Sequence, residues 1–508
     1  MNLTILSTSD IHGYIAPINY HEQNQVGPGG LTRVAAYLEE IKTMAGYNDM
    51  ILTIDNGDFI QGSPLTEYLH RFDPFVAPDL SRIMNRMKYN AAILGNHEFN
   101  YGRDYLELVM SKRQFPVLCA NILDQDGKPY FGTPYHIFRK HDVTVAILGL
   151  TTTAVTKWEP RRHLTGLSFV SAVQTAKNYL PQLQNQADVV VIAYHGGFND
   201  KPLSSDESDE ATALTALPGV NAMITSHHQP LATIVNNIPV TQVGCHGASI
   251  GRLDLTVDQH HITQTKASLI HTDTRLPSLI PVPPTIQTAE LETRSWLNQE
   301  IGCFPGGAKL SDLTDAQVHG HPLIDFFNQV QSDAAAVDIS GAAILSATGQ
   351  GFEEQVTMRQ VLTNYPFSNS LAVLEVTGAD LYAALERCAG YWQWNNGQLN
   401  PVAASRPNQY DLFTGIDYIF DVSKPIGKRV VALHYHHQPV NPDDRLHIVL
   451  NHYRALGGDG FPMFSANKII KEIPISMPKL IEQYFKKHPH INLTHQRLYK
   501  VTAKDIVL

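Results

Sequence analysis

The sequence is poor in cysteine and has no long apolar run, and each absence argues against a class of protein. Its 508 residues include four cysteines, which lie far apart and form no C-x-x-C pair. This pattern favours free thiols in a reducing compartment over a disulfide framework. No apolar run approaches the ~18 residues of a membrane-spanning helix. The first residues lack the basic region and cleavage site of a signal peptide, so we expect a cytoplasmic protein that does not bind membranes.

The sequence also lacks an excess of basic residues. Its 38 Lys and Arg residues stand against 48 Asp and Glu residues, which gives a formal net charge of −10. A nucleic-acid polymer needs a basic face, so it is not an expected partner, whereas a small anionic substrate held by bound metal is compatible with this charge. Nothing indicates an obligate protein partner. Apolar residues make up 43% of the chain, enough for the two or more domains that this length predicts.

The first part of the chain alternates short β-type runs with helix-type segments, which indicates an α/β fold. Most residues of these runs are β-branched or apolar, as expected of strands buried on both faces. The predicted strands span residues 3–7, 50–54, 91–94, 117–120, 143–148, 189–193 and 222–225. Helices are predicted from residue 31 and over residues 78–87.

A proline cluster divides the chain. Four prolines lie between residues 277 and 284, the strongest linker signal in the sequence. Helices are predicted over residues 289–301 and 321–335, and the second could either connect two domains or be the first core helix of the later one. We predict a first domain over 1–318, a connecting helix over 319–336 and a second domain over 337–508. Thr377 and Asp380 form a capping-box-like pair at a further predicted helix start.

Side chains that suit metal binding follow five of the predicted strands. In an open α/β sheet, ligands bind beyond the carboxyl ends of the strands. Because alternate side chains of extended backbone share a face, an i, i+2 pair can point into one site. The set is Asp10, His12, Asp58, Asn96, His97, His195, His227 and Gln229.

The chemistry of this set favours a two-metal site. Imidazole with carboxamide and carboxylate suits Mn, Zn, Fe or Co. Asp58 could bridge two ions, since both of its oxygens have lone pairs to spare. Two ions about 3.5–4 Å apart can hold a bridging hydroxide and clamp both oxygens of an in-line phosphoryl displacement. His97, without an obvious ligand role, is then a natural general acid or a donor to the transition state.

These motifs resemble those of the calcineurin-like metallophosphoesterases. They are Asp10-x-His12, Gly57-Asp58, Gly95-Asn96-His97-Glu98, His195 and His227-x-Gln229. The second half resembles the C-terminal domain of the bacterial 5′-nucleotidases and 2′,3′-cyclic-nucleotide 2′-phosphodiesterases, in Phe367-Ser368-Asn369, Thr377-Gly378 and residues 413–418 and 451–462. The resemblance covers nearly the whole chain. It implies a four-layer α/β/β/α metallophosphoesterase domain followed by an α+β domain that binds the nucleoside.

The resemblance also implies a role for each residue. One ion would be held by Asp10, His12, Asp58 and Gln229, and the other by Asp58, Asn96, His195 and His227. His97 would be the catalytic histidine, with Asn100 orienting it. Phe413 and Tyr453 look like the rings that sandwich a base, an interaction worth about 1–3 kcal/mol per base. Asp459 and Asn369 match family positions that bind the substrate.

Three departures from the family pattern bear on the substrate. Ser226 replaces the glycine that usually precedes His227, which changes backbone freedom but not the ligand. Asn100 stands where many 5′-nucleotidases have aspartate, and an amide can orient His97 without stabilising its imidazolium by charge. Residues 340–345 lack the arginine that grips phosphate in those enzymes. The last two departures favour a cyclic nucleotide over a 5′-monophosphate.

The sequence therefore predicts a divalent-metal-dependent hydrolase of nucleotide phosphoesters. The favoured activity is that of a 2′,3′-cyclic-nucleotide 2′-phosphodiesterase that can also act as a 3′-nucleotidase. The alternative within enzymes is a 5′-nucleotidase or a nucleotide-sugar hydrolase. A catalytically silent nucleotide-binding protein is a third hypothesis, which the complete ligand set disfavours.

Overall fold

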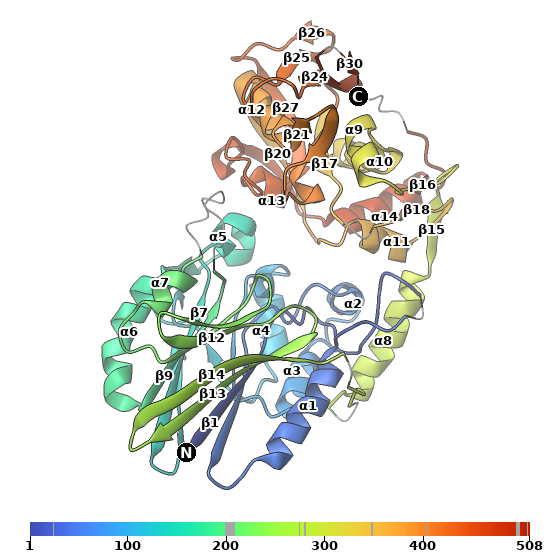
Figure 1. The fold of residues 1–508 in the computed structure, drawn as a ribbon. Helices are drawn as coiled ribbons and strands as arrows, with labels where there is room; N and C mark the ends of the chain where they lie inside the picture. Colours follow the sequence, from blue (N-terminus) through green and yellow to red (C-terminus); the bar gives the residue numbers. More distant parts are fainter. Residues whose placement is uncertain are drawn as a thin grey trace. The chain divides into compact units, whose positions relative to one another are not determined.

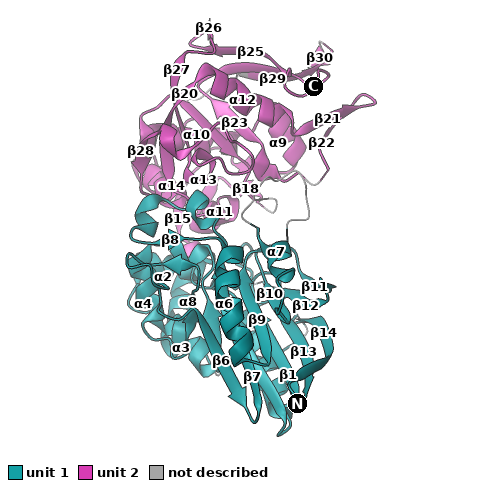
Figure 2. Ribbon diagram, turned by 90° about the vertical axis from the view of Figure 1, so that its left-hand side faces the viewer, with its two compact units in different colours: residues 1–293 teal, residues 294–508 magenta. Residues whose placement is uncertain are grey.

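The chain forms two compact units. The computed structural model describes all residues except 24, 199–208, 274, 279–280, 347–348, 404, 494–497, 505 and 508. Unit 1 spans residues 1–293 and unit 2 spans residues 294–508 (Figure 2). The boundary therefore falls inside helix α8 (Pro284–Leu297), not at 318/319 as predicted from the sequence.

Unit 1 contains two six-stranded sheets. The first has the strand order β14-β13-β1-β2-β3-β4 and the second β11-β12-β10-β9-β7-β6. Strands β1 to β4 are parallel, and so are β7, β9, β10 and β12. The first sheet comprises β1 (Asn2–Thr8), β2 (Asp49–Asp55), β3 (Ala91–Ile93), β4 (Val117–Leu118), β13 (Ser249–Asp258) and β14 (His261–His271). The second comprises β6 (Tyr135–Lys140), β7 (Val143–Thr151), β9 (Val189–His195), β10 (Ala222–Thr225), β11 (Leu231–Val235) and β12 (Ile238–Gln242).

An apolar core lies between these two sheets. Leu3 and Ile5 of β1 enter it from one side, and Val191 of β9 enters it from the other. On its outer face the second sheet packs against α6 (Ala172–Gln186), where Leu148 of β7 is buried. Helices α1 (Leu31–Met44) and α3 (Pro78–Arg86) flank the first sheet on the opposite side (Figure 1). The predicted four-layer α/β/β/α architecture is confirmed. The central parallel strands are covered on both faces, which is why β7 and β9 are buried along their whole length, whereas the outer strand β14 is largely exposed and polar.

Unit 2 is an α+β unit with two five-stranded sheets. The first sheet is ordered β23-β17-β27-β20-β28 and the second β26-β25-β24-β29-β30. Helix α10 (Pro322–Ala335) packs on β17, with Phe326 and Phe327 fully buried, so it is a core helix of unit 2 rather than a connector. The first sheet comprises β17 (Ile339–Ala343), β20 (Leu371–Thr377), β23 (Asp411–Thr414), β27 (Arg445–Asn451) and β28 (Ile469–Ile473). The second comprises β24 (Asp417–Asp421), β25 (Val430–Tyr435), β26 (Gln438–Pro439), β29 (Leu498–Ala503) and β30 (Ile506–Val507).

Local sequence signals identify some helix ends well and others poorly. Thr377 caps α12 (Gly378–Ala389) in a capping box with Asp380, as predicted. The helix predicted over 289–301 instead ends at Leu297, and Glu300–Cys303 forms strand β15, which pairs with β19 (Gln355–Thr357). Among the helices that the structure describes, none has the length and apolarity needed to cross a membrane.

Candidate metal and active site

The candidate site lies beyond the carboxyl ends of strands from both sheets of unit 1. Backbone hydrogen bonds join the loops there, since Asp10 N donates to Gly57 O at 2.9 Å and His12 N donates to Asp58 O at 2.8 Å. The residues that reach this edge are Asp10 and His12 after β1, Asp58 after β2, Asn96 and His97 after β3, His195 at the end of β9 and His227 after β10. Parallel strands present their carboxyl ends at one edge, so residues far apart in the chain meet there.

Four of these residues have left-handed backbone. The φ angles of Asp10, His12, Asp58 and His227 are 52°, 51°, 57° and 70°. Such angles are uncommon outside glycine and cost about 1–3 kcal/mol each. The surrounding hydrogen bonds hold these residues in that conformation, at the points where the chain leaves a strand and turns.

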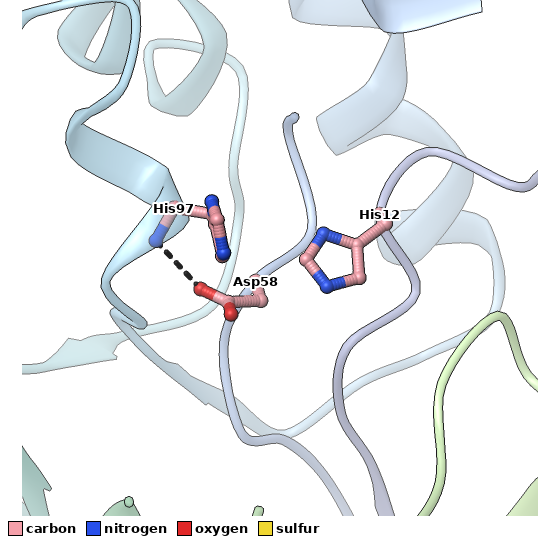
Figure 3. A group of neighbouring side chains, drawn as sticks. All are labelled: His12, Asp58 and His97. Carbon is pink, nitrogen blue, oxygen red and sulfur yellow. Dashed lines mark hydrogen bonds between the residues drawn. The ribbon is translucent and has the colours of Figure 1, made fainter. Parts of the chain in front are cut away.

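Two overlapping groups of side chains have the geometry of metal sites. In the first, His12, Asp58 and His97 offer ligand atoms within 4.8 Å of one another, and in the second Asp58, His195 and His227 do the same. Figure 3 shows the rings of His12 and His97 on either side of the Asp58 carboxylate. Asp58 is 1% exposed, and its Oδ1 accepts a hydrogen bond from His97 N at 2.8 Å. A carboxylate that belongs to both groups is placed as a bridging ligand would be.

The contacts of His195 show that this position suits a cation. Its Nδ1 lies 2.6 Å from the carbonyl oxygen of Asn56, which can only accept, so Nδ1 carries the proton. In the neutral ring, Nε2 is then an acceptor, yet it faces Asp58 Oδ2 at 3.2 Å and Asn96 Oδ1 at 3.1 Å. Asp58 Oδ2 is buried and has no hydrogen-bond partner among the described residues. Three converging acceptors repel one another unless a positive charge lies among them, so these residues fit a metal ion.

His12 is oriented in the same way. Its Nδ1 lies 2.7 Å from the carbonyl oxygen of Gln61, which fixes the proton on Nδ1 and leaves Nε2 free to bind a metal. Gly62 makes this close approach possible, because a Cβ at position 62 would lie 2.6 Å from His12 Cβ. Asp10 adds charge nearby, with Oδ1 at 3.9 Å from His12 Nε2.

The electrostatics of the site favour the metal-binding forms of two ligands. Burial alone would raise the pKa of Asp58, but the imidazoles of His195 and His97 outweigh it and hold the pKa well below its ordinary value. Burial, together with the neighbouring His195, lowers the pKa of His227 to about 4. For His195, burial opposes the charged form, but Asp58 outweighs it and raises the pKa to about 10. The negative field that favours a proton on His195 would also attract a metal ion there.

The remaining predicted ligands differ in their placement. Asn96 is buried and points its amide oxygen at His195. Asp10 is buried, and its Oδ2 accepts a long hydrogen bond of 3.4 Å from His227 N. Gln229 is exposed, and its described contact is made by its backbone oxygen, which accepts from Gln242 Nε2 at 2.6 Å. A ligand role for the Gln229 side chain stays a prediction.

The predicted catalytic pair is in contact. His97 Nδ1 and Asn100 Oδ1 are 2.6 Å apart, and Asn100 Nδ2 in turn donates to Glu159 Oε1. Burial alone would lower the pKa of His97, but Asp58 and the hydrogen bond to Asn100 outweigh burial and raise it above its ordinary value. His97 can therefore hold a proton at Nε2 beside the candidate metal ligands, which is what a general acid requires.

Glu98 is the residue of this site that sequence reasoning missed. Its buried carboxylate accepts four backbone hydrogen bonds: Oε2 from Gly95 N at 2.6 Å and Asp58 N at 2.7 Å, and Oε1 from Phe59 N at 2.6 Å and Ile60 N at 3.3 Å. These donors belong to the loops after β2 and β3. Gly95 must lack a side chain, because a Cβ there would lie 2.2 Å from Asp58 Oδ1. Glu98 thus fixes the loop of Asp58 against the loop of Asn96 and His97.

Replacing Glu98 with glutamine is expected to loosen both loops. The amide group of glutamine would face two backbone N–H groups and leave them unpaired, which costs about 2–4 kcal/mol of folding stability. Both the melting temperature and kcat should fall, since the loops that carry the candidate ligands are no longer fixed against each other. The matched control is Glu210→Gln, because the Glu210 carboxylate also accepts from backbone, Ala172 N and Val173 N, but outside the site. The control should lose stability and keep kcat. An unchanged kcat in Glu98→Gln would contradict this role.

The residues predicted to bind the nucleoside lie in unit 2. Tyr453 is half-buried, and its ring packs over Gly458, where a Cβ would lie 2.4 Å from the ring. Asp459 has left-handed backbone and accepts from Asn408 Nδ2 at 3.1 Å and Arg406 Nη2 at 3.3 Å.

The other two predicted contacts of the nucleoside are less exposed to a ligand. Phe413 is 1% exposed and packs against Gly341, so the structure shows a core ring rather than an open platform. Asn369 is half-buried, and its backbone oxygen accepts from Met477 N at 2.9 Å. Roles for all four residues in substrate binding stay predictions.

Comparison with known proteins agrees with this arrangement. The pattern of the calcineurin-like phosphoesterase family matches residues 3–230, and that of the 5′-nucleotidase C-terminal domain matches residues 302–466. A Staphylococcus aureus protein of known crystal structure, described as a 5′-nucleotidase, is 31% identical. The alignment covers 99% of this chain and 100% of that protein, with a TM-score of 0.91.

Two further relatives are named for nucleotide chemistry. A 2′,3′-cyclic-nucleotide 2′-phosphodiesterase/3′-nucleotidase of Haemophilus influenzae is 26% identical over 96% of this chain and 84% of its own length. A trifunctional nucleotide phosphoesterase of Bacillus subtilis is 26% identical over 97% of this chain, which spans 38% of that protein. This chain therefore belongs to the family of metal-dependent phosphoester hydrolases that join a calcineurin-like phosphoesterase domain to a 5′-nucleotidase C-terminal domain.

Proposed function

We propose that the protein hydrolyses 2′,3′-cyclic nucleotides at the 2′ position and can go on to hydrolyse the resulting 3′-phosphate. The observation that carries this proposal is the neutral character of β17, where 5′-nucleotidases would have a phosphate-binding arginine. Ser340 on this strand donates to Asn328 Oδ1 at 2.8 Å and accepts from Gln331 Nε2 at 2.9 Å. A cyclic diester carries one negative charge, so it needs less cationic binding than a 5′-monophosphate. The name of the Haemophilus relative agrees with this choice.

We further propose that the site holds two divalent ions, of Mn, Zn, Fe or Co. The shared position of Asp58 supports two ions, and the mixture of imidazole and oxygen ligands supports these metals. When bound, such ions neutralise charge on the phosphoryl oxygens and make an attacking water more acidic. Metal analysis of active protein should give two ions per chain, and a single ion per active chain would contradict the proposal.

The residues of the chain supply orientation and a proton. His12 and His195 keep their Nδ1 protons on backbone carbonyl oxygens, which directs both Nε2 atoms into the site. When water attacks phosphorus, the bond from phosphorus to the 2′-oxygen breaks, and that oxygen needs a proton. His97 Nε2 is placed to donate it, because its Nδ1 is held by Asn100. The product is a 3′-phosphate with a free 2′-hydroxyl.

A substrate comparison tests the proposed activity. With Mn²⁺ present, kcat/KM for 2′,3′-cyclic AMP should exceed that for AMP at least about tenfold, a difference of about 1.4 kcal/mol in transition-state binding. Initial rates measured side by side on one preparation decide the matter. Faster release of phosphate from AMP would support the alternative, a 5′-nucleotidase. It would also show that the lack of an arginine on β17 does not determine which nucleotide is hydrolysed.

Binding of the nucleoside is proposed for unit 2. Stacking between Phe413 and Tyr453 would tolerate different bases, with Asp459 and Asn369 near the sugar or base. For Phe413 this requires its ring to leave the buried position described above. A cytoplasmic location is also proposed, supported by four free cysteines. Cell fractionation would test it.

A further inference from the structure

A chain of hydrogen bonds leads from His97 to a buried carboxylate in another part of unit 1. His97 Nδ1 contacts Asn100 Oδ1 at 2.6 Å, and Asn100 Nδ2 donates to Glu159 Oε1. The other oxygen of Glu159 lies 3.1 Å from His163 Nδ1. Glu159 is 6% exposed and directly follows helix α5 (Val155–Trp158). The Asn100 amide therefore lies between an imidazole and a carboxylate.

The carboxylate determines which way the amide faces. An asparagine amide has nearly the same shape in its two orientations, so contact with His97 alone would not select one. A carboxylate only accepts, so the Asn100 NH₂ group must face Glu159 and its oxygen must face His97. His97 must then keep its proton on Nδ1 and present Nε2 to the site.

The segment that carries Glu159 is fixed against other residues of the site. Trp158 stacks on His227, with ring centroids 5.2 Å apart and planes 15° apart. Thr152 N donates to the backbone oxygen of His195 at 2.8 Å, and Glu159 N donates to Val155 O at 2.9 Å. Glu159 is thus held at a defined distance from Asn100 by contacts with two predicted ligands.

We propose that Glu159 is a positioning residue for catalysis, which acts through Asn100 to fix the tautomer and orientation of His97. The inference rests on the proposed role of His97 as general acid. Glu159 and Asn100 together supply what an aspartate at position 100 would supply alone: a fixed acceptor for Nδ1 and a negative charge behind it. The negative charge then lies on Glu159, which contacts Asn100, and not on the side chain that contacts the imidazole.

The first test replaces Glu159 with glutamine. A glutamine can accept from Asn100 or donate to it, so both amide orientations become available and the tautomer of His97 is no longer selected. For 2′,3′-cyclic AMP and for diphenyl phosphate, kcat should fall about tenfold with KM nearly unchanged, as expected when a residue that orients a histidine is lost. For bis(p-nitrophenyl) phosphate the fall should be under about twofold, because its leaving group needs little protonation.

The decisive test repeats the substitution in the Asn100→Asp protein. Here two carboxylates face each other, so Asn100→Asp alone should lower kcat. Adding Glu159→Gln replaces a repelling carboxylate with an amide that can donate to the introduced carboxylate, so it should now raise kcat several-fold. A residue that merely supported the fold would lower kcat in both backgrounds. Equal effects in the two backgrounds, or an unchanged kcat in the first test, would overturn the proposal.

Controls separate this proposal from general effects. Glu67→Gln is the matched variant, because Glu67 is also 6% exposed but accepts from Tyr101 at 2.9 Å instead of Asn100. It should leave kcat unchanged. If Glu159→Gln does not fold, Glu159→Asp replaces it in the test. The shorter side chain keeps the charge but moves the carboxylate away from Asn100, so kcat must fall as it is expected to fall in Glu159→Gln. A wild-type protein that cleaves diphenyl phosphate but no nucleotide would refute the proposed substrate, while the comparison of variants with diphenyl phosphate would still test Glu159.

Discussion

The Asp58→Asn variant is expected to lose turnover, with kcat lower by at least about 10³-fold for every phosphoester. Bound metal contributes several kcal/mol to stabilising a phosphoryl transition state, and each 1.36 kcal/mol is a factor of about ten in rate. Asp58 is the carboxylate common to both candidate metal groups, and its buried Oδ2 faces His195 Nε2 at 3.2 Å. Asparagine removes the charge and turns one acceptor into a donor. Rates with Mn²⁺ and metal content per chain should fall together.

Asp55→Asn is the matched control for this experiment. Asp55 lies three residues earlier, is as buried as Asp58 at 1% exposure, and accepts from Thr8 Oγ1 at 3.0 Å. Burial raises the pKa of Asp55 to about 7, so the folded state disfavours the charged form of this carboxyl. The control should keep most of its kcat and its metal. Full activity in Asp58→Asn would contradict the two-metal arrangement.

Replacing His97 with glutamine should lower kcat for 2′,3′-cyclic AMP by about 10²–10⁴-fold, the usual contribution of a general acid. The structure groups His97 with His12 and Asp58, so this ring has the position of a ligand as well as that of an acid. The metal content of the variants distinguishes a metal ligand from a general acid. A general acid can be removed without losing metal, so the variant should bind as many ions as the wild type, whereas His12→Gln should bind fewer.

The leaving group gives a second check on His97. The loss in His97→Gln should be much smaller for bis(p-nitrophenyl) phosphate, whose leaving group is stable as an anion. His246→Gln is the control: this histidine lies near His12 but stacks on Tyr14, with centroids 3.9 Å apart. It should keep its kcat. Loss of metal from His97→Gln, or an equal loss of rate with both substrates, would make His97 a ligand rather than an acid.

The positions of the candidate ligands could be predicted from the sequence because they follow strands. An apolar run followed by Asp58 or by Asn96 and His97 is a local pattern, and the geometry of parallel sheets brings such strand ends together. The structure places Asp10, His12, Asp58, His195 and His227 within one edge of the two sheets. Gln229 satisfied the same pattern, yet its side chain is exposed, since spacing alone does not fix the course of a loop.

The residues that orient the ligands could not be predicted in this way. Glu98 binds backbone N–H groups. Because every loop carries such groups, no sequence pattern shows which of them a given carboxylate will bind. Glu159 is 59 residues from its partner Asn100, so only the folded chain brings them together. The helix predicted over 289–301 overlaps the start of strand Glu300–Cys303 for a similar reason, because pairing of this strand with Gln355–Thr357 outweighs the local helical preference.

The four hydrogen bonds of Glu98 have a consequence for how such a site can change over generations. Glu98 holds the main chain of the two loops and touches none of the ligand side chains through these bonds. Substitutions at Asn96, His97 or Asn100 therefore change side chains of the site and leave these four hydrogen bonds in place. The side chain at position 100, which contacts His97, can therefore change while the backbone of both loops keeps its place.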